Sequence, residues 1–337
     1  MADYTIITRQ KRGVLHQRRH QLCQDSMTVF PDQDALVLAV ADGHGGSLYT
    51  RSGLGARIAC KAVRLLATFQ TKQQAVTEVK SCFDRLVEKH LAFRPLPDDQ
   101  KKLLNGQPDS TVYGTTLVAA VIREEETILY QIGDGGVFLL NERGRFLPPL
   151  AADSDCIGSC TSSLVYTRER YLEHIRISRC AGRPAAIMLF TDGINFSSST
   201  PWKAACLLRA PDKLETTVDQ LLANSGHGDD QTFILAYDPD KVSSPAFLAG
   251  LDAEEQRGQR EQKLSILQEQ KKQLECWLQL ALQKGRRMKY QPEKAAEFAQ
   301  FCNLIKDRML QRGTLLQEME HLEQQLKSFA PTPPTKT

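Results

Sequence analysis

Short apolar runs bounded by turn residues dominate the first 240 residues or so of the chain. Each run is rich in aliphatic or β-branched residues and has the length of one buried strand. Two longer stretches, 49–69 and 73–91, carry apolar residues at helical spacing. The sequence therefore predicts strands combined with two long helices. The predicted strands are 35–41, 115–122, 127–132, 137–140, 185–190 and 233–237.

The pattern changes near residue 251, where the chain becomes helical, rich in glutamine and charged. Apolar residues approximate a heptad from Leu264 to Leu278 and again from Phe298 to Leu326. Pro292 and the basic break before it favour an antiparallel hairpin over one long rod. We therefore predict a first domain, a linker, a helical hairpin arm and a disordered tail. Their expected ranges are 1–240, 241–250, 251–329 and 330–337.

Composition narrows the class of protein. With 337 residues and a formal net charge of +3, the chain can build a sizeable core and has no strong electrostatic bias towards nucleic acid. The first residues lack the layout of a secretory signal, and the longest apolar run, 35–41, is too short to cross a bilayer. We expect a cytoplasmic protein without a membrane or nucleic-acid partner. The nine cysteines read as reduced core residues.

Aspartate motifs stand at the ends of predicted strands or in the turns that follow them. Carboxylates from distant parts of the chain can converge there, and oxygen ligands of this kind suit Mg²⁺ or Mn²⁺. Glycine after several of these aspartates lets the backbone turn sharply and lets an ion or a phosphate approach. Any single Asp-Gly is a common turn dipeptide, so the ordered set carries the argument. The motifs are Gln24-Asp25-Ser26, Asp42-Gly43-His44-Gly45-Gly46, Gly133-Asp134-Gly135-Gly136, Thr191-Asp192-Gly193 and Gly228-Asp229-Asp230-Gln231-Thr232.

In this order and at these spacings, the motifs resemble those of the metal-dependent type 2C Ser/Thr protein phosphatases. The resemblance covers about residues 8–237 and is strongest for the bacterial subgroup whose first motif ends in Cys-Gln-Asp. It implies an α+β fold, an αββα sandwich of two antiparallel sheets flanked by helices. It also implies hydrolysis of phosphoserine or phosphothreonine in proteins by a metal-activated water at a binuclear Mg²⁺ or Mn²⁺ centre.

The resemblance assigns metal ligands residue by residue. Asp42 matches the carboxylate that bridges two metals, and Gly43 matches a carbonyl ligand. Asp192 and Asp229 match direct ligands of the second metal, and Asp25 matches the acid of the opening motif. Two ions are therefore expected. Asp25 and Asp42 are also expected to be catalytic.

Two further positions extend this expected site. Asp134 matches an aspartate that helps to hold a third metal in bacterial members, although the usual Ser-Arg after it is Gly135-Gly136 here. A third ion is thus an open alternative. His44 matches a histidine that serves as general acid or as part of the water network for the leaving oxygen.

The group that grips the substrate phosphate is the least defined. The arginine that many members place five residues before the first aspartate falls on His20 in an ungapped alignment. Arg18 and Arg19 are alternatives, because arginine can bind phosphate with two hydrogen bonds, and His16 is another. A solvated basic loop is an equally good interpretation of this segment.

Other functions compete with this hypothesis. The domain could be a catalytically dead module that binds partners through its helical arm, or a metal-dependent phosphatase of a small phosphorylated metabolite. Cys302 and Arg308 fit the Cys-x5-Arg spacing of thiolate phosphatases, but without glycines and within the predicted arm. Cys156 and Cys160 fit half of a zinc site. Expected partners are phosphorylated proteins and a cognate Ser/Thr kinase, and the arm is expected to dimerise or to dock a partner.

Overall fold

The structure, a computed structural model, describes residues 4–68, 72–147, 150, 161–194, 201–225, 228–288 and 295–327. The chain divides into two compact units. The first unit is made of residues up to 251 apart from 198–202, and the second of 198–202 and the residues after 251. The first unit contains both β-sheets, and the second contains most of the helical arm.

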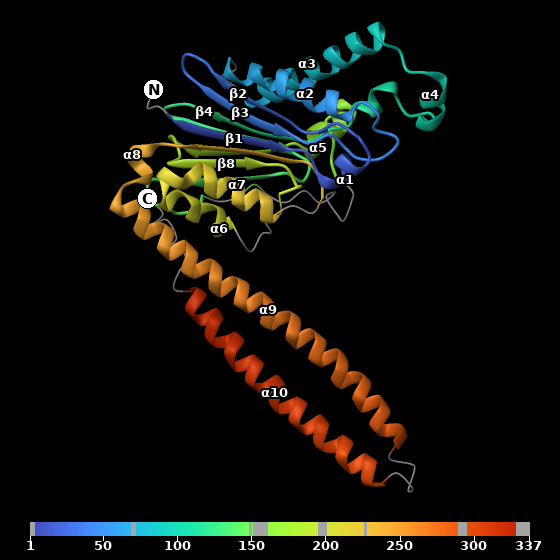
Figure 1. Ribbon diagram of the computed structural model, residues 1–337, viewed down its shortest axis with the longest axis vertical. Coiled ribbons are helices and arrows are strands. Elements are labelled where there is room, and N and C mark those ends of the chain that lie inside the picture. Colours follow the sequence, from blue (N-terminus) through green and yellow to red (C-terminus); the bar gives the residue numbers. More distant parts are fainter. Residues whose placement is uncertain are drawn as a thin grey trace. The chain divides into compact units, whose positions relative to one another are not determined.

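Two antiparallel sheets form the centre of the first unit (Figure 1). One has four strands in the order β1-β9-β8-β6, and the other has five in the order β2-β3-β4-β5-β7. This confirms the predicted αββα sandwich. The strands are β1 (Thr5–Lys11), β2 (Ser26–Pro31), β3 (Leu36–Ala41), β4 (Leu117–Ile122), β5 (Glu126–Ile132), β6 (Gly136–Leu140), β7 (Arg176–Ala181), β8 (Ala186–Phe190) and β9 (Gln231–Tyr237).

Three layers of apolar contact hold the sandwich together. Residues such as Leu38 and Ile234 fill the space between the two sheets. Helices α2 (Ser52–Ala62) and α3 (Lys72–Phe93) cover the outer face of the five-stranded sheet. Helices α6 (Pro201–Ala205) and α7 (Leu214–Ser225) cover the outer face of the other sheet (Figure 1). Every central strand is therefore buried on both faces, which explains its continuous apolar run.

All six predicted strands are present, and β1, β2 and β7 are strands that we did not predict. Each of these three lies at the edge of its sheet. Their burial patterns alternate or are only partial, and β1 and β7 contain several charged or polar residues. An edge strand buries little of its surface, so it lacks the apolar run by which the central strands were recognised.

The predicted helices occur with small changes. Range 49–69 becomes α2 followed by a 3-10 helix, Val63–Ala67, and range 73–91 becomes α3. After α3, the short helix α4 (Asp98–Leu104) buries Leu104. The other short helices are α1 (Val14–Arg18), Asp109–Tyr113, α5 (Arg168–His174), Cys206–Arg209, Pro211–Lys213 and α8 (Pro239–Val242).

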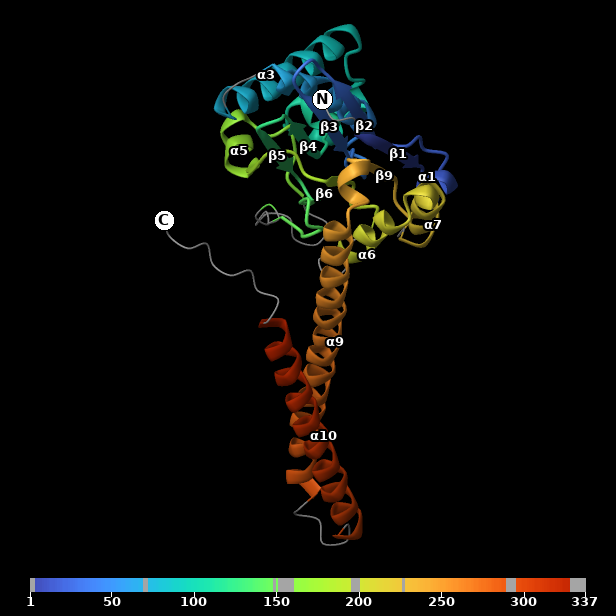
Figure 2. The ribbon, with the colours of Figure 1, turned by 90° about the vertical axis from the view of Figure 1, so that its left-hand side faces the viewer.

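The helical arm consists of α9 (Pro245–Met288) and α10 (Ala295–Lys327), which run side by side (Figure 2). Lys263 pairs with Glu318 at 2.6 Å and Arg312 with Glu275 at 3.0 Å, so the two helices are antiparallel. Leu267, packed against Met319 and Leu322, centres a small apolar core. The predicted hairpin is therefore confirmed.

Range 241–250 is helical and not an extended linker. It contains the end of α8 and the first residues of α9. Phe247 is fully buried in the core beneath the four-stranded sheet, and this burial stabilises helix where we expected a boundary. The predicted tail, 330–337, lies outside the described residues. In the described part of the chain, no helix combines the length and apolar character needed to span a membrane.

Candidate metal centre

Asp42 follows strand β3, and its backbone is fixed by two threonines. Its N–H donates to Thr116 Oγ1 at 3.0 Å, and its carbonyl accepts from Thr115 Oγ1 and from the Thr116 N–H, both at 2.8 Å. These bonds leave the side chain free to point into the site. The sequence analysis did not identify Thr115 and Thr116, although a pair of buried threonines next to a strand is a usable signal.

Asp42, Asp134 and Asp192 converge from different strand ends. Asp134 lies in the turn between β5 and β6, and Asp192 follows β8. One ligand oxygen from each of these three aspartates lies within 4.8 Å of the others. Residues 92 or more positions apart from Asp42 in the chain are thus brought to one point by the two sheets.

Asp25 lies beside this group, immediately before β2. Its side chain is almost completely buried and accepts a hydrogen bond from Thr191 Oγ1 at 2.7 Å on Oδ2. The other oxygen, Oδ1, is buried without a hydrogen-bond partner. We use the name acidic centre for the four residues Asp25, Asp42, Asp134 and Asp192.

Asp25, Asp42 and Asp134 have raised pKa values. Burial raises the pKa of Asp25 to about 7, although hydrogen bonds from Thr191 and Thr232 act in the opposite direction. Burial, and then the carboxylates of Asp25 and Asp192, hold the pKa of Asp42 well above its usual range. Loss of contact with water, and then Asp192, raise the pKa of Asp134. Crowded like charges of this kind call for a cation.

Gly43 has no room for a side chain. An added Cβ would lie 2.7 Å from the carbonyl oxygen of Gln24 and 2.9 Å from that of Ser52. Glycine is therefore required at position 43, because the backbones of Gln24 and Ser52 come close to it.

His44 lies against Tyr49, with 5.0 Å between ring centroids, and its N–H donates to the Gly114 carbonyl at 3.0 Å. Burial lowers the pKa of His44 to about 4, so its imidazole is neutral at neutral pH. Gly114 makes room for it, since a Cβ there would lie 2.6 Å from His44 Cδ2. Of the two expected roles, membership of a water network suits a neutral ring better than that of a protonated acid.

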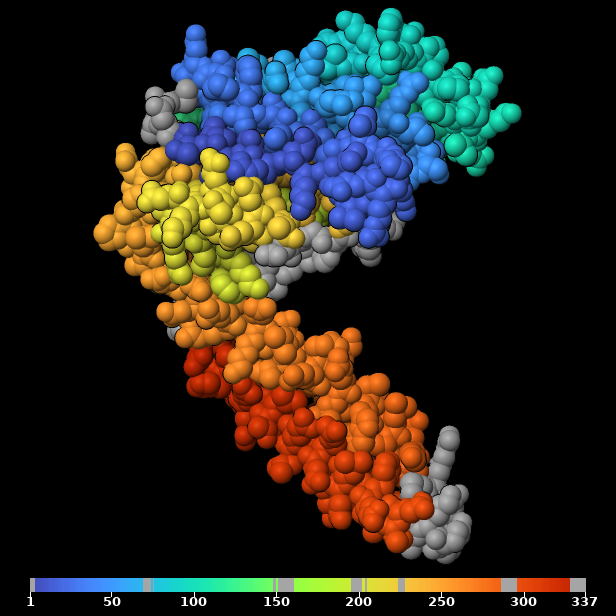
Figure 3. Space-filling model, viewed as in Figure 1, coloured from blue at the N-terminus to red at the C-terminus, as the bar shows by residue number. Residues whose placement is uncertain are grey.

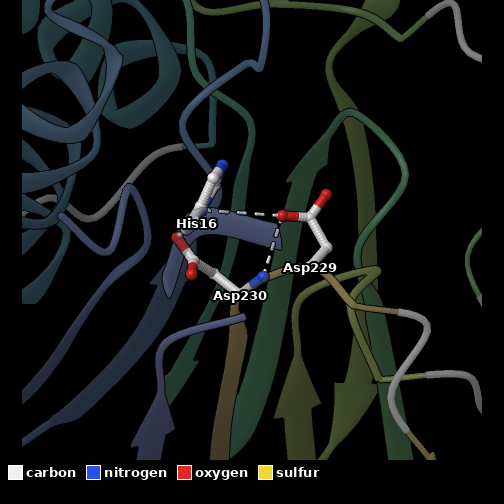
Figure 4. Close-up of side chains that lie close together, drawn as sticks. All are labelled: His16, Asp229 and Asp230. Atoms are coloured by element: carbon white, nitrogen blue, oxygen red, sulfur yellow. Dashed lines mark hydrogen bonds and ion pairs between the residues drawn. The ribbon is translucent and has the colours of Figure 1, made fainter. Parts of the chain in front are cut away.

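Asp229 belongs to a second group, with His16 and Asp230 (Figure 4). His16 Nδ1 lies 2.9 Å from an Asp230 oxygen and 3.9 Å from an Asp229 oxygen. Asp230 also accepts from the Gly13 N–H at 2.7 Å and from the Gln24 N–H at 2.6 Å. The sequence analysis gave Asp230 no role, but it joins the loop after β1 to the start of β9.

Glycines on both sides allow this close packing. A Cβ on Gly13 would lie 2.3 Å from the Asp229 carbonyl carbon, and one on Gly193 would lie 1.8 Å from the Asp230 carbonyl oxygen. The backbone at Asp229 and Asp230 is therefore held between two loops. One of these loops carries Asp192, so the second group is tied to the acidic centre.

A cavity of about 880 Å³ opens beside Asp229 and His16. Of the three residues predicted to grip phosphate, Arg19 lines it, whereas Arg18 and His20 do not. His20 is exposed and has a φ of 55°. We call this space the basic cavity, because its lining includes Arg19, Arg51, Arg57 and Arg94.

The thiolate alternative has no support in the structure. Cys302 and Arg308 both lie within helix α10, and Arg308 donates to Gln311 at 2.8 Å on the same helix. No loop is present there to cradle a phosphate. Cys156 and Cys160 lie outside the described residues.

Comparison with known protein families gives a match over most of the first unit. The profile of the family described as Protein phosphatase 2C matches residues 12–226, well over half of the 337-residue chain. A search of curated proteins finds no match.

Solved structures with a similar fold include three bacterial phosphatases. A bacterial serine phosphatase has 15% identity and a TM-score of 0.48, covering 70% of this chain and 98% of its own. Mycobacterium tuberculosis PstP/Ppp has 18% identity and a TM-score of 0.48, covering 69% of this chain and 98% of its own. Staphylococcus aureus Stp1 has 14% identity and a TM-score of 0.47, covering 70% of this chain and 95% of its own. The profile match shows that the chain belongs to the protein phosphatase 2C family, whose members are metal-dependent protein serine/threonine phosphatases.

Proposed function

We propose that this phosphatase binds its catalytic ions, Mg²⁺ or Mn²⁺, through Asp42, Asp134 and Asp192, with Asp25 beside them. The observation that carries the proposal is the convergence of three carboxylate oxygens within 4.8 Å. Gly43 and Asp229 remain predicted ligands. Two ions and three ions are the alternatives, because the carboxylates could share two ions or Asp134 could help to hold a third. From the motif Cys23-Gln24-Asp25 we also propose that the chain belongs to the bacterial subgroup whose first motif ends in Cys-Gln-Asp.

The donor set fits a hard divalent cation. It consists of oxygens alone, it includes a buried carboxylate oxygen of Asp25 without a hydrogen-bond partner, and the pKa values of Asp25 and Asp42 are raised. Divalent cations in such a site lower the pKa of water and neutralise phosphate charge. No nucleophilic side chain is then needed.

The protein's own groups orient the reaction. Thr191 holds Asp25 through one carboxylate oxygen, and Thr115 and Thr116 hold Asp42 through its backbone. His44, as a neutral imidazole, can pass a proton along hydrogen-bonded water to the leaving serine or threonine oxygen. Arg19 and His16, which line the cavity next to Asp229, are the proposed phosphate contacts.

The first test is hydrolysis of a phosphothreonine peptide and of para-nitrophenyl phosphate with Mn²⁺, Mg²⁺, Ca²⁺ or a chelator. Turnover should need Mn²⁺ or Mg²⁺, and Asp42→Asn and Asp192→Asn should each lower kcat by roughly 10³-fold or more. Asp99→Asn, an exposed change on α4, is the matched control and should retain full activity. Turnover that persists with the chelator would reject the metal mechanism.

We propose phosphoproteins, with a cognate Ser/Thr kinase, as the partners and the cytoplasm as the location. Activity on a phosphorylated metabolite is the alternative. Comparing kcat/KM for phosphothreonine peptides with that for free phosphothreonine and nucleotides distinguishes the two. A preference for the small molecules would make the metabolite the substrate.

The arm is proposed as a contact element. Several large apolar side chains on it are exposed, among them Leu280 at 61% and Leu310 at 75%. We propose that this surface self-associates, and light scattering on the full chain tests it. Leu280→Glu with Leu310→Glu should convert a dimer into a monomer. A wild-type monomer would reject self-association and leave partner docking, and a protein that also lacked turnover with every metal would be a binding module.

A further inference from the structure

The basic cavity collects positive charge from three segments of the phosphatase domain. Arg19 follows α1, Arg51 immediately precedes α2, Arg57 lies in the middle of α2, and Arg94 follows α3. Asp229 is the acidic residue among the lining residues. Figure 3 shows the blue N-terminal segments and the cyan end of α3 with α4 forming one continuous surface on this side.

These arginines are not neutralised by the protein. In the part of the chain that the structure describes, none of the four has a carboxylate within ion-pair distance. Arg51 donates instead to the carbonyl oxygens of Arg94 at 2.6 Å and Pro95 at 3.1 Å, and to the Tyr113 hydroxyl at 2.9 Å. These partners are uncharged, so they fix the guanidinium in place and leave its charge uncompensated.

His90 lies in the same cavity, close to two of these arginines. Its Nδ1 lies 2.6 Å from the Tyr113 hydroxyl, next to Arg51, and it lines the same cavity. Desolvation, and then the charges of Arg51 and Arg94, lower its pKa. Positive potential thus extends across the cavity from the end of α3 to the start of α2.

The lining of the cavity comes close to the acidic centre along the chain. Gln24 precedes Asp25 of the acidic centre, and Gln24, His16 and Asp229 all line the cavity. Its volume, about 880 Å³, lies in the range of pockets that enclose whole ligands. A peptide whose phosphate reaches the acidic centre therefore has space, next to that phosphate, for several side chains among unpaired arginines.

On this basis we propose that the basic cavity binds acidic groups of the phosphoprotein substrate that flank the phosphorylated residue, and so selects substrates with acidic flanks. The inference rests on the proposed function of the neighbouring centre. Complementary charge steers association and excludes like-charged partners, so the preference belongs in kcat/KM. The same guanidinium groups bind carboxylates and phosphates in pairs of hydrogen bonds, so a second phosphorylated residue is an alternative source of the acidic group.

The test compares phosphothreonine peptides of one length with glutamate, glutamine or lysine flanks, and one with glutamine flanks plus a second phosphothreonine. We expect kcat/KM to be roughly tenfold or more higher for glutamate than for glutamine flanks, and lower still for lysine. The doubly phosphorylated peptide shows whether phosphate serves as well as carboxylate.

Charge reversal in the cavity then locates the effect. Arg57→Glu with Arg94→Glu should lower the glutamate-to-glutamine ratio of kcat/KM to about 1 or below. Lys61→Glu with Lys89→Glu is the matched control. It makes the same charge change at exposed positions of α2 and α3, outside the cavity lining, and should keep the wild-type ratio. Urea unfolding of both variants checks that each is folded.

A binding measurement separates this proposal from the proposed function. A fluorescent peptide with glutamate flanks and an unphosphorylated threonine should bind, and its Kd should rise roughly tenfold in the Arg57→Glu, Arg94→Glu variant. Charge-dependent binding without hydrolysis of any peptide would uphold the cavity and reject the phosphatase assignment. Hydrolysis with equal kcat/KM for glutamate and glutamine flanks would overturn the cavity proposal and leave the phosphatase intact. An equal fall in the glutamate-to-glutamine ratio of kcat/KM in the control variant would also overturn the cavity proposal.

Discussion

The acidic centre and the basic cavity are neighbours in one domain but are built in opposite ways. The centre brings together carboxylates from four strand ends, and burial raises the pKa of Asp25, Asp42 and Asp134 there. The cavity spreads its arginines over exposed positions such as Arg57 and Arg94. The crowded carboxylates repel one another unless a cation is bound. The arginines are spread apart and lack only carboxylate partners. In our proposal, the close packing of the carboxylates creates the metal site, and the charge of the arginines selects the peptides that approach it.

Asp230 connects these two regions, and its removal should have the largest effect on stability. It is buried and accepts from the N–H groups of Gly13 and Gln24, next to His16. Asp230→Ala leaves these groups unpaired, so we expect a loss of about 3 kcal/mol or more in the free energy of unfolding. Urea unfolding measures it, with exposed Asp34→Ala as the control. A loss below about 1 kcal/mol would mean that the two regions are not joined through Asp230.

Metal should stabilise the acidic centre. At a Mn²⁺ concentration about 100 times Kd, binding adds about 2.7 kcal/mol to the free energy of unfolding. Asp42→Asn removes one of the crowded charges, so the metal-free variant should unfold at a higher temperature than wild type and gain less from Mn²⁺. Calorimetry with Mn²⁺ or chelator measures both shifts. Equal Mn²⁺ shifts in the two proteins would place the ion elsewhere.

A smaller loss is expected where the backbone of the acidic centre meets that of the second group. In Gly193→Ala the new Cβ would lie 1.8 Å from the Asp230 carbonyl oxygen, so the loop carrying Asp192 must shift. We expect a cost of about 2 kcal/mol together with reduced Mn²⁺ affinity. Gly45→Ala is the control, because nothing lies within 4 Å of a Cβ there. Unchanged Mn²⁺ affinity in Gly193→Ala would show that the loop tolerates the shift.

Sequence reasoning succeeded where the signal is local. The central strands carry unbroken apolar runs, and Asp42, Asp134 and Asp192 each sit in a short motif at a strand end, so both could be predicted. Edge strands such as β1 could not, because partial burial leaves them no distinct pattern. The linker over 241–250 was wrong because Phe247 packs into a core that only the folded domain provides.

The phosphate-binding side of the site was harder to predict for a different reason. His16 lies next to Asp229 only because Asp230 pulls the loop after β1 against β9. Arg51 faces Arg94 through hydrogen bonds to backbone carbonyls at the end of α3, a contact that no spacing in the sequence reveals. Contacts between distant segments build this region, whereas the aspartates of the acidic centre are marked by their neighbours in the sequence.

Ionic strength gives the smallest and most selective effect. The Debye length falls from about 10 Å at 0.1 M salt to about 3 Å at 1 M, so the exposed charges of the basic cavity are screened in this range. We expect the glutamate-to-glutamine ratio of kcat/KM in the wild type to fall by about threefold between 0.1 M and 1 M NaCl. Hydrolysis of para-nitrophenyl phosphate, which is too small to reach both regions, should change less. If both substrates lose activity in parallel, salt acts on the buried acidic centre, and the contrast between the two regions fails.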